Sequence, residues 1–600
     1  LATGDGDGVL YDKDVQDYVS YSLGVIKSTD GGATWQTTGL NWQTSNARLI
    51  SRLLVSPTNP NIVLAATSQG VYRTFDGGTT WTITQGGRFY DMEFKPEDAT
   101  TLYASTGNEI YKSVNEGSTW TKLNTGIPTN VGRVAIGVSS YNSDMIYAVC
   151  ASKNNWGFGG FYSSSNAGQT WQAKTTKLNL LGYEADGNDS PSEEFQGWYD
   201  LAIAVSPSSS QDVYVGGINI WKTTNGGTSW TCNAHWYGDN DLPYVHADIH
   251  DLAVSENSPS TVYTGSDGGV FQTTNDGKTW NDVSAGLGIM QFYRIASASS
   301  NTILLGGAQD NGTNMLKNGD WTQVNDGDGM NCLIDPNNSN TLYASAQSGD
   351  ISRSTDGGEN FPSFINSDIT NEPASWVAPY VFDPTNSRSI YAGFVNVWKY
   401  NPTSNKWRKI SNLVNGSTLN YIAVASSDTN YVYAGNDGEL SYSSNGGKSW
   451  NAITIPAQLG SITHLAVHPK NPQRIWITVS GYASKKVMES GNAGGAWTDI
   501  SAGLPSIPIN CILYQNNSPD RLYVGTEAGV YYRDNDLPQW QAYNEGLPNV
   551  IVSDLTINYN AKKLFAGTYG RGVWEANLIT CSAAPVSMAV TGGKNIICNG

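Results

Sequence analysis

The stretch VHADIH, residues 245 to 250, holds the residue types best suited to chemistry in this chain. His246, Asp248 and His250 stand at every second position, so a β-strand would project all three to the same side. Imidazole and carboxylate groups that converge in this way can hold zinc or another transition metal. The same groups could instead hydrogen-bond to each other as a structural pair. The pattern therefore indicates a metal site or a polar closure of the fold.

Acidic side chains follow closely in the segments TGSDGGV, GGAQDNGT and VNDGDGMNC. Their oxygen atoms suit calcium, which is the one cofactor that the sequence indicates, although aspartate and glycine are also common in tight turns. No nucleophile elbow, Walker A loop or HExxH motif occurs, so an enzyme of this sequence would have to use paired carboxylates in a cleft. The candidates for that pair are Asp267, Asp310, Asp326 and Asp328.

A long insertion, LLGYEADGNDSPSEEFQGWYDLAIAVS at 180–206, places aromatic rings beside carboxylates. Rings stack on sugar faces and acids accept hydroxyl groups, so this composition is typical of a glycan-binding surface. The alternative is a solvated loop with one tryptophan tucked into a sheet. With the amides of IMQFYRIA and GGAQDNGT, the residues expected to contact a ligand are Tyr183, Glu184, Trp198, Tyr199, Gln291, Gln309 and Asn311.

These segments lie in a repeating framework. A nine-residue segment of the type KSTDGGATW recurs nine times, from residues 27–35 to a copy that ends at Trp497, which indicates architecture. One whole unit, 252–284, contains four strand-like runs separated by turns: DLAVS, TVYTG, GVFQT and TWNDV. Four short antiparallel strands in each unit are the signature of a propeller blade. The recurring segment is then the turn between the third and fourth strands.

Thirteen such units can be counted by their second strands, of which the first lacks its innermost strand and the last lacks a fourth. One further unit upstream would make fourteen, or two rings of seven. We therefore predict an all-β chain with tandem seven-bladed propellers at 1–285 and 286–579, followed at 580–600 by the beginning of an Ig-like or PKD-like module. The strand order places the recurring turns at one end of each ring and the chemistry-bearing loops at the other.

Composition limits the partners. The net charge of −18 argues against nucleic acid and against an anionic membrane surface, since nothing would neutralise phosphate groups. No apolar run approaches the ~18 residues that span a bilayer, so membrane insertion is not expected. A glycan or a protein remains as the expected ligand.

The S-x-D-x-G-x-T-W segments resemble Asp-box or BNR repeats, which occur in sialidases, sortilin-type receptors and family 74 xyloglucan hydrolases. Family 74 enzymes are twin seven-bladed propellers that clasp a glucan between them and cleave it with two aspartates. The phrases QGWYDLAIAVSP, VHADIHDLAV, GGAQDNGT and TYGRGVWEA look like those of large secreted multidomain proteins of Bacteroidetes-type bacteria, and with the repeats they cover residues 1 to about 579. That resemblance implies secretion or cell-surface attachment, a type IX secretion signal, and further domains in the same longer chain.

Two functions are therefore predicted. The first is a secreted or cell-surface module that binds a glycan or protein, with calcium bound. The alternative is a twin-propeller glycoside hydrolase that acts on a β-glucan. An inverting hydrolase needs two exposed carboxyl groups roughly 6.5 to 9.5 Å apart, whereas acids that point at one ion or at backbone amides favour binding.

Overall fold

The computed structural model describes residues 1–3, 21–123, 125–175, 177–190, 193–238, 241–298, 303–362, 364–369, 372–413, 416–579 and 589–590. Its strands form antiparallel sheets, nearly all of them four-stranded, and the helical structure in the described residues consists of short 3₁₀ turns such as η2 (Thr44–Asn46) and η4 (Gln347–Gly349). The predicted all-β propeller architecture is confirmed. Among the described residues, no helix has the length and apolarity needed to cross a membrane.

The chain divides into two compact units, Leu1–Val283 and Ser284–Gly600. In the part of the first unit that the structure describes, a two-stranded sheet is followed by five four-stranded sheets, each built from consecutive strands. Their strands are β1 (Gly24–Lys27), β2 (Gln36–Asn41); β3 (Ile50–Val55), β4 (Val63–Thr67), β5 (Gly70–Thr74), β6 (Thr82–Gly86); β7 (Asp91–Lys95), β8 (Asp98–Ser105), β9 (Ile110–Ser113), β10 (Thr121–Lys122); β11 (Val131–Val138), β12 (Ile146–Ser152), β13 (Phe158–Ser164), β14 (Gln172–Thr175); β15 (Ala202–Val205), β16 (Val213–Gly216), β17 (Ile220–Thr223), β18 (Thr231–Ala234); β19 (Ile249–Val254), β20 (Val262–Ser266), β21 (Gly269–Thr273) and β22 (Asn281–Asp282).

The described residues of the second unit form seven sheets, of which six have four strands and one has three. Their strands are β23 (Phe292–Ser297), β24 (Leu304–Ala308), β25 (Thr313–Lys317), β26 (Asp320–Asn325); β27 (Cys332–Ile334), β28 (Leu342–Ser345), β29 (Ile351–Ser354); β30 (Tyr380–Asp383), β31 (Asn386–Gly393), β32 (Val397–Asn401), β33 (Lys406–Lys409); β34 (Tyr421–Val424), β35 (Val432–Gly435), β36 (Leu440–Ser443), β37 (Asn451–Ile453); β38 (Ile462–Val467), β39 (Ile475–Val479), β40 (Val487–Ser490), β41 (Thr498–Asp499); β42 (Ile509–Tyr514), β43 (Leu522–Thr526), β44 (Gly529–Arg533), β45 (Gln541–Ala542); β46 (Val552–Asn558), β47 (Lys563–Thr568), β48 (Val573–Asn577) and β49 (Ala589–Val590).

Burial within a sheet follows strand order. The second strand is buried along its whole length in β16, β39 and β43, because neighbouring sheets cover both of its faces. These strands accordingly read as continuous apolar runs such as IWITV and LYVGT. Fourth strands such as β10 and β45 have two residues, both exposed, and so leave only a short edge. The core of each unit therefore lies between the second strands of adjacent sheets.

The recurring segment forms the turn between third and fourth strands. Between β5 and β6, Asp76 accepts hydrogen bonds from the Thr74 hydroxyl at 2.8 Å and from the Thr80 backbone N–H at 2.9 Å. The Thr80 hydroxyl donates to the other carboxylate oxygen at 2.6 Å, and these bonds lower the pKa of Asp76 to about 2. Gly78, at φ 97°, supplies the left-handed backbone that closes the turn. The polar side chains of this segment therefore hydrogen-bond to one another and to the backbone of their own turn.

The tryptophan that ends the segment joins neighbouring sheets. The indole N–H of Trp171 donates to the Leu123 carbonyl at 3.0 Å, and that of Trp450 donates to the Ile410 carbonyl at 2.8 Å. In both cases the acceptor belongs to the preceding repeat, 40 or more positions earlier. In these two copies the ring therefore packs between two sheets and satisfies its N–H there, whereas the indole N–H groups of Trp230 and Trp280 are buried without a hydrogen-bond partner among the described residues.

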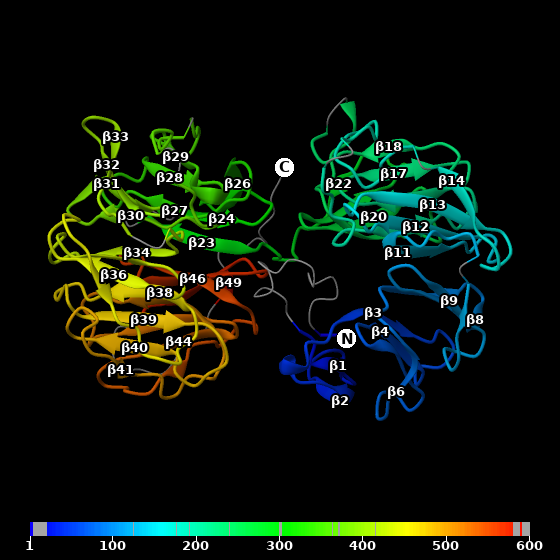
Figure 1. Ribbon diagram of the computed structural model, residues 1–600, viewed down its shortest axis with the longest axis horizontal. Helices are drawn as coiled ribbons and strands as arrows, with labels where there is room; N and C mark the ends of the chain where they lie inside the picture. The colour runs from blue at the N-terminus through cyan, green and yellow to red at the C-terminus, as the bar shows by residue number, and fades with distance from the viewer. Residues whose placement is uncertain are drawn as a thin grey trace. The chain divides into compact units, whose positions relative to one another are not determined.

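The second unit closes on itself where its last sheet meets its first (Figure 1: the red β46 beside the green β23). The Ile295 backbone N–H donates to Asp554 Oδ2 at 2.9 Å, and the Asn558 amide donates to the Ala298 carbonyl. These partners lie 259 and 260 positions apart in the sequence. The seven sheets of this unit thus form a ring.

The last sheet departs from the prediction. Trp574 and Glu575 of β48 pair with Val590 and Ala589, so β49 is the fourth strand that the sequence pattern did not reveal. The strand falls inside 580–600, the range predicted to begin an Ig-like module, and it belongs to the sheet of the second unit. The other residues of that range, 580–588 and 591–600, lie outside the described residues.

Candidate functional site

Two loops and one turn of the first unit carry most of the residues expected to meet a ligand. The first loop joins β14 to β15, the second joins β18 to β19, and the turn joins β20 to β21. In a propeller the loops that lead to a new first strand and the turns after a second strand leave the same end of the ring, because neighbouring strands are antiparallel. The candidate site lies at that end.

Asp267, in the turn, accepts hydrogen bonds at both carboxylate oxygens. The Tyr199 hydroxyl donates to Oδ2 at 2.7 Å, and His250 Nε2 lies 2.7 Å from Oδ1. The rings of Tyr199 and His250 meet edge to face, with centroids 4.6 Å apart. The three side chains therefore fix one another, so Asp267 orients the histidine and the tyrosine.

Two further acids lie beside this group. The Gln196 amide donates to Asp248 Oδ1 and, at 3.4 Å, to Asp200 Oδ2. Burial, together with the charge of Asp248, raises the pKa of Asp200 well above its usual value. Burial and the nearby Asp267 carboxylate raise the pKa of Asp248 to about 6. These carboxyl groups therefore hold protons at a higher pH than exposed ones, which is frequent at functional sites.

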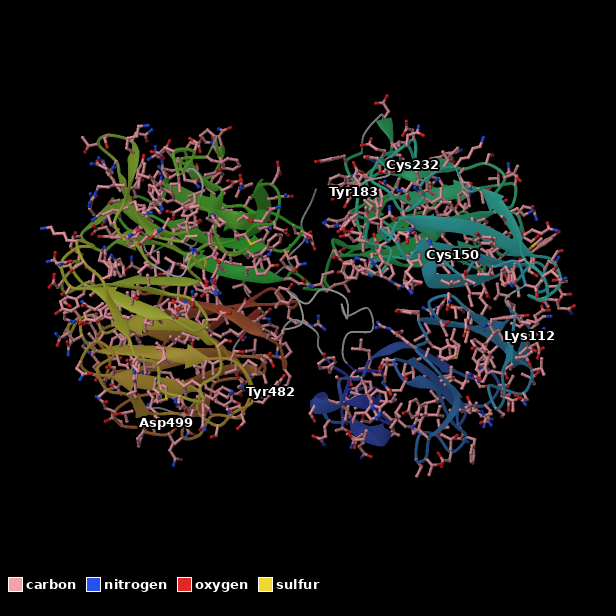
Figure 2. All side chains as sticks on the ribbon, in the orientation of Figure 1. Lys112, Cys150, Tyr183, Cys232, Tyr482 and Asp499 are labelled. Carbon is pink, nitrogen blue, oxygen red and sulfur yellow. The ribbon has the colours of Figure 1, made fainter. Side chains whose placement is uncertain are left out.

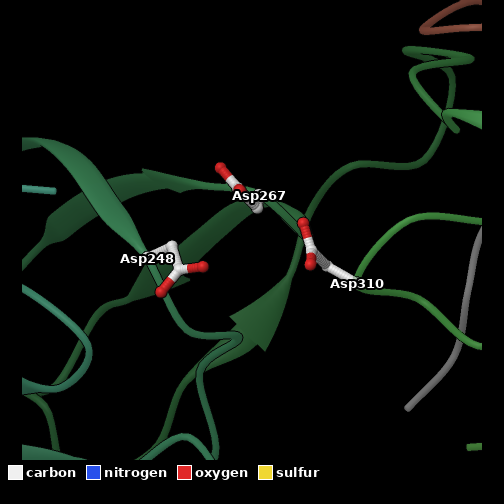
Figure 3. A group of neighbouring side chains, drawn as sticks. All are labelled: Asp248, Asp267 and Asp310. Atoms are coloured by element: carbon white, nitrogen blue, oxygen red, sulfur yellow. The ribbon is translucent and has the colours of Figure 1, made fainter. Parts of the chain in front are cut away.

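Figure 3 shows the side chains of Asp248 and Asp267, which have a carboxylate oxygen each within 4.8 Å of the other. Asp310, also labelled there, belongs to the second unit and is described with it below. Like charges at such a separation disfavour double ionisation, in agreement with the raised pKa of Asp248. The first unit supplies these two oxygens toward a cation, whereas calcium takes six to eight.

The prediction that His246, Asp248 and His250 project from one side of a strand is wrong. β19 begins only at Ile249, and Asp248 has φ 65°, so the alternation of an extended strand does not apply before it. His246 packs against Gly268, where an added Cβ would lie 2.2 Å from its ring. The two histidines contact different residues through their rings, but both lie near enough to Asp248 to offset part of the rise in its pKa. A metal ion held by this triad stays a prediction.

Arg133 positions the loop that carries Gln196 and Tyr199. One guanidinium nitrogen donates to the backbone carbonyls of Trp198 and Tyr199, each at 2.9 Å, and the side chain is buried. A buried arginine that holds two carbonyls fixes the backbone on which the site depends. Trp198, expected to contact a ligand, is half-buried with its ring centroid 5.3 Å from that of Tyr199.

Aromatic rings from both loops lie together in the first unit. The ring of Tyr183, labelled in Figure 2, has its centroid 5.9 Å from that of Phe195 and 6.2 Å from that of Trp236. The rings of Trp236 and Tyr237 follow with centroids 3.8 Å apart, and Tyr237 is 72 % exposed. Glu184, on the same loop as Tyr183, is exposed as well. We call Tyr183, Trp236 and Tyr237 the aromatic platform.

In the second unit, the predicted amides serve the local structure. Gln309 accepts hydrogen bonds from the hydroxyls of Tyr293, at 2.9 Å, and Tyr569. Asn311 donates to the Gln309 carbonyl at 2.9 Å, and Gln291 pairs with Tyr569 through the backbone. These bonds join the first and last sheets of the ring, so the amide oxygen of Gln309 is already engaged.

The acids of the second unit also bond locally. Asp328 accepts the Asp310 backbone N–H at 2.6 Å, which stabilises a turn in which Asp310 has φ 56°. Asp326 is exposed and accepts from the Gln323 amide at 3.4 Å. Of the four aspartates predicted as catalytic candidates, Asp267 therefore lies with the site of the first unit, and the other three lie in loops of the second.

The sequence interpretation missed Gln196, Asp200, Trp236 and Tyr237. Two signals were available: the adjacent aromatics of HWY at 235–237, and an aspartate directly before an apolar strand in WYDLAIAV. Neither is distinctive in one sequence, because aromatics and turn-forming acids are frequent throughout this chain.

Comparisons with known proteins agree with this architecture. A family model described as the DUF6242 beta propeller domain matches residues 380–545, which comprise four sheets of the second unit. No curated protein matches the chain.

Several solved structures share the fold at low sequence identity. A GH74 enzyme of Niastella koreensis has a TM-score of 0.61 at 18 % identity, covering 92 % of this chain and 86 % of its own. The GH74 xyloglucanase of Xanthomonas campestris has a TM-score of 0.64 at 15 % identity, covering 96 % and 89 %. PorZ, a surface component of the type IX secretion system of Porphyromonas gingivalis, has a TM-score of 0.50 at 14 % identity, covering 87 % and 73 %. At these identities the likeness concerns the fold.

Proposed function

We propose that the chain is a glycan-binding β-propeller protein whose recognition surface is the aromatic platform of the first unit together with the neighbouring acids. The observation that carries this proposal is the presence of rings and hydrogen-bonding groups at one end of the unit: Trp236 and Tyr237 present aromatic surface, and Gln196 and Asp248 belong to loops of the same end. Aromatic faces accommodate the apolar faces of sugars, and amides and carboxylates bind their hydroxyls.

The bonds of Asp267 support binding over hydrolysis. Asp248 and Asp267 approach within 4.8 Å, closer than the roughly 6.5 to 9.5 Å of an inverting glycosidase and near the ~5 to 5.5 Å of a retaining one, whose second carboxylate must be free to attack the sugar. Both oxygens of Asp267 already accept hydrogen bonds from side chains. Asp267 therefore serves mainly to fix the positions of Tyr199 and His250, and the acids of this site are arranged to accept hydrogen bonds from hydroxyl groups.

The test is calorimetric titration with soluble xyloglucan, β-glucan and host-type oligosaccharides, using Tyr237→Ala and Trp236→Ala variants. Loss of a stacked ring is expected to weaken binding about tenfold, or ~1.4 kcal/mol. Tyr141→Ala is the matched control, because Tyr141 is 65 % exposed but lies between β11 and β12, at the opposite end of the unit. Equal affinities for all three variants would remove the platform from the proposal.

The second candidate is a glycoside hydrolase, favoured by the pKa of about 6 at Asp248, which would let that carboxyl donate a proton near neutral pH. Reducing-end release from the same glycans, compared between the native protein and Asp248→Asn, tests it. Release that the variant loses would establish hydrolysis at this site. Binding without release would leave the first proposal in place.

We place the protein outside the cytoplasm, secreted or at the cell surface, and expect type IX secretion. The fold that it shares with PorZ, a bacterial surface component of that system, supports this location. Calcium is proposed as a cofactor of the acidic end, with the remaining oxygens supplied by water or ligand, since Asp248 and Asp267 are two of the groups needed.

A further inference from the structure

A pocket of about 350 Å³ opens at the same end of the first unit, between the sheets β3–β6, β7–β10 and β11–β14. Its wall is formed by the loop from β6 to β7, the turn from β8 to β9, the start of β11 and the turn from β12 to β13. The volume falls within the range of about 300 to 1,000 Å³ that is usual for small-molecule sites. None of the residues predicted from the sequence lines it.

Glycines keep the pocket open. A Cβ at Gly107 would lie 2.7 Å from the Gly132 carbonyl oxygen, and a Cβ at Gly132 would lie 2.4 Å from the Trp156 ring. At Gly86 an added Cβ would meet nothing within 4 Å. The lining strands and the tryptophan ring can therefore approach one another while the space above them stays free of side chains.

Trp156 is part of the pocket wall, and its backbone has an uncommon conformation. Its φ is 58°, in the left-handed region that bulky residues rarely adopt. The conformation is held by its own N–H, which donates to the Ser152 carbonyl at 3.1 Å, and by its carbonyl, which accepts the Gly197 N–H at 3.0 Å. Such strain is characteristic of residues whose side chain is positioned for a ligand. Tyr90 contributes a second ring to the wall.

Two cations face this pocket without an acidic partner. Within the described part of the chain, neither Arg88 nor Lys153 forms a side-chain ion pair or hydrogen bond, and Arg88 Nε is buried without a hydrogen-bond partner. The Arg88 guanidinium lies over the Tyr90 ring, 4.6 Å from its centroid. In a chain of net charge −18, two unpaired cations in one hollow form a local anion-attracting site.

The one acid in the wall is already neutralised. Glu109 pairs with Lys122 and accepts a hydrogen bond from the Tyr111 hydroxyl at 2.5 Å, and these contacts lower its pKa. Its charge therefore does not cancel those of Arg88 and Lys153. The pocket is therefore lined by two positive charges, two aromatic rings and several glycines.

We infer that this pocket binds an anionic sugar residue, of which a uronic acid is the expected form. Arg88 and Lys153 pair with the carboxylate, the Tyr90 ring supports the Arg88 guanidinium, and Trp156 contacts the apolar face of the sugar ring. Guanidinium and ammonium groups suit a carboxylate, and exposed ring faces suit a pyranose. The residues of this pocket differ from those of the aromatic platform, so the inference stands independently of the proposed function.

The test is calorimetric titration of the whole chain with trigalacturonate, tri-glucuronate and an oligoguluronate at low salt. Each of Arg88→Gln and Lys153→Gln is expected to weaken binding about tenfold or more, because each removes one charged hydrogen bond. Lys278→Gln is the control: it makes the same charge change at an exposed position in the turn between β21 and β22, at the opposite end of the unit. Lys153 is exposed, so its variant tests the inference even where loss of Arg88 disturbs folding.

Ligand variants separate the possible sources of affinity. The methyl ester of trigalacturonate keeps the sugar shape and removes the charge, so it should bind at least tenfold more weakly. A sugar phosphate that binds in place of the uronates would identify phosphate as the anion recognised. Equal binding of the ester, unchanged affinity in the Arg88→Gln, Lys153→Gln double variant, or no binding of any anionic sugar would overturn the inference.

Discussion

The raised pKa of Asp248 predicts a pH-dependent gain in stability for Asp248→Asn. The pKa of Asp248 is about 6 in the folded protein against an ordinary value of 3.8. An acid with a raised pKa is most favourable to folding when it is protonated, below its unfolded pKa, and that contribution is lost as pH rises through about 6. A difference of about 2.2 pH units corresponds to about 3 kcal/mol of unfavourable free energy once the group is ionised.

Asparagine at this position keeps the acceptor for Gln196, tolerates the left-handed backbone and never ionises. The variant should therefore gain up to about 3 kcal/mol over the native protein at pH 8 and almost nothing at pH 4. For a unit of 283 residues this amounts to roughly 5 °C in Tm. Scanning calorimetry of both proteins at the two pH values measures it.

Carboxyl groups remote from Asp248 titrate equally in the two proteins. The pKa of Asp200, which the charge of Asp248 helps to raise, falls in the variant, so the difference in Tm reports Asp248 together with this neighbour. Glu184→Gln serves as the control, because it neutralises an exposed acid on a loop of the same end. An Asp248→Asn shift in Tm that is equal at pH 4 and pH 8, or a lower Tm at pH 8, would contradict this prediction. Either result would mean that burial and Asp267 do not perturb this carboxyl in solution.

Four further outcomes are expected. Asp534→Asn should cost the second unit about 3 to 5 kcal/mol, seen as a lower Tm, because it leaves the guanidinium of Arg521, 2 % exposed, without its buried partner. Trp450→Phe should cost about 1 kcal/mol in the same assay by removing the indole hydrogen bond to Ile410. Burial lowers the pKa of His464 to about 3, so the stability that the neutral ring contributes above pH 6.5 is lost as pH falls. The decrease in Tm between pH 7 and pH 4 should therefore be smaller in His464→Gln than in the native protein. Millimolar calcium should raise Tm relative to EDTA in the native protein and not in Asp267→Asn, whereas an equal shift in both would place the ion elsewhere.

The fold was predictable because the sequence pattern of a single blade recurs many times along the chain. Second strands such as VYVG and IWITV are apolar along their whole length, since sheets cover both of their faces, and that pattern recurs in nearly every unit. β49 was not predictable, because two residues, Ala589 and Val590, pair with β48 after an interval that resembles no repeat. In the sheet β27–β29 the sequence signal is present but the strand is not. Its recurring segment ends at Phe361 and leads to no paired fourth strand among the described residues.

The site was predictable in its residue types and its end of the ring, but not in its contacts. Gln196 and Asp248 are 52 positions apart, and Tyr199 and Asp267 are 68 apart. Which loop residue meets which depends on where each strand begins, and a shift of one residue reverses the side to which a side chain points. The left-handed backbone at Asp248 is such a local departure, and it overturned the expected histidine alignment.

No sheet of the ring in the second unit depends on the point at which the chain enters the ring. Every one of its sheets is made from consecutive strands, and its first and last sheets are joined by contacts such as those between Ile295 and Asp554, without the exchange of a strand. Cutting the chain between any two sheets and linking the start of β23 to the end of the last sheet would therefore break no sheet. Circular permutants of this unit should fold to the same ring, so the order in which its blades are synthesised can be varied while the structure is kept.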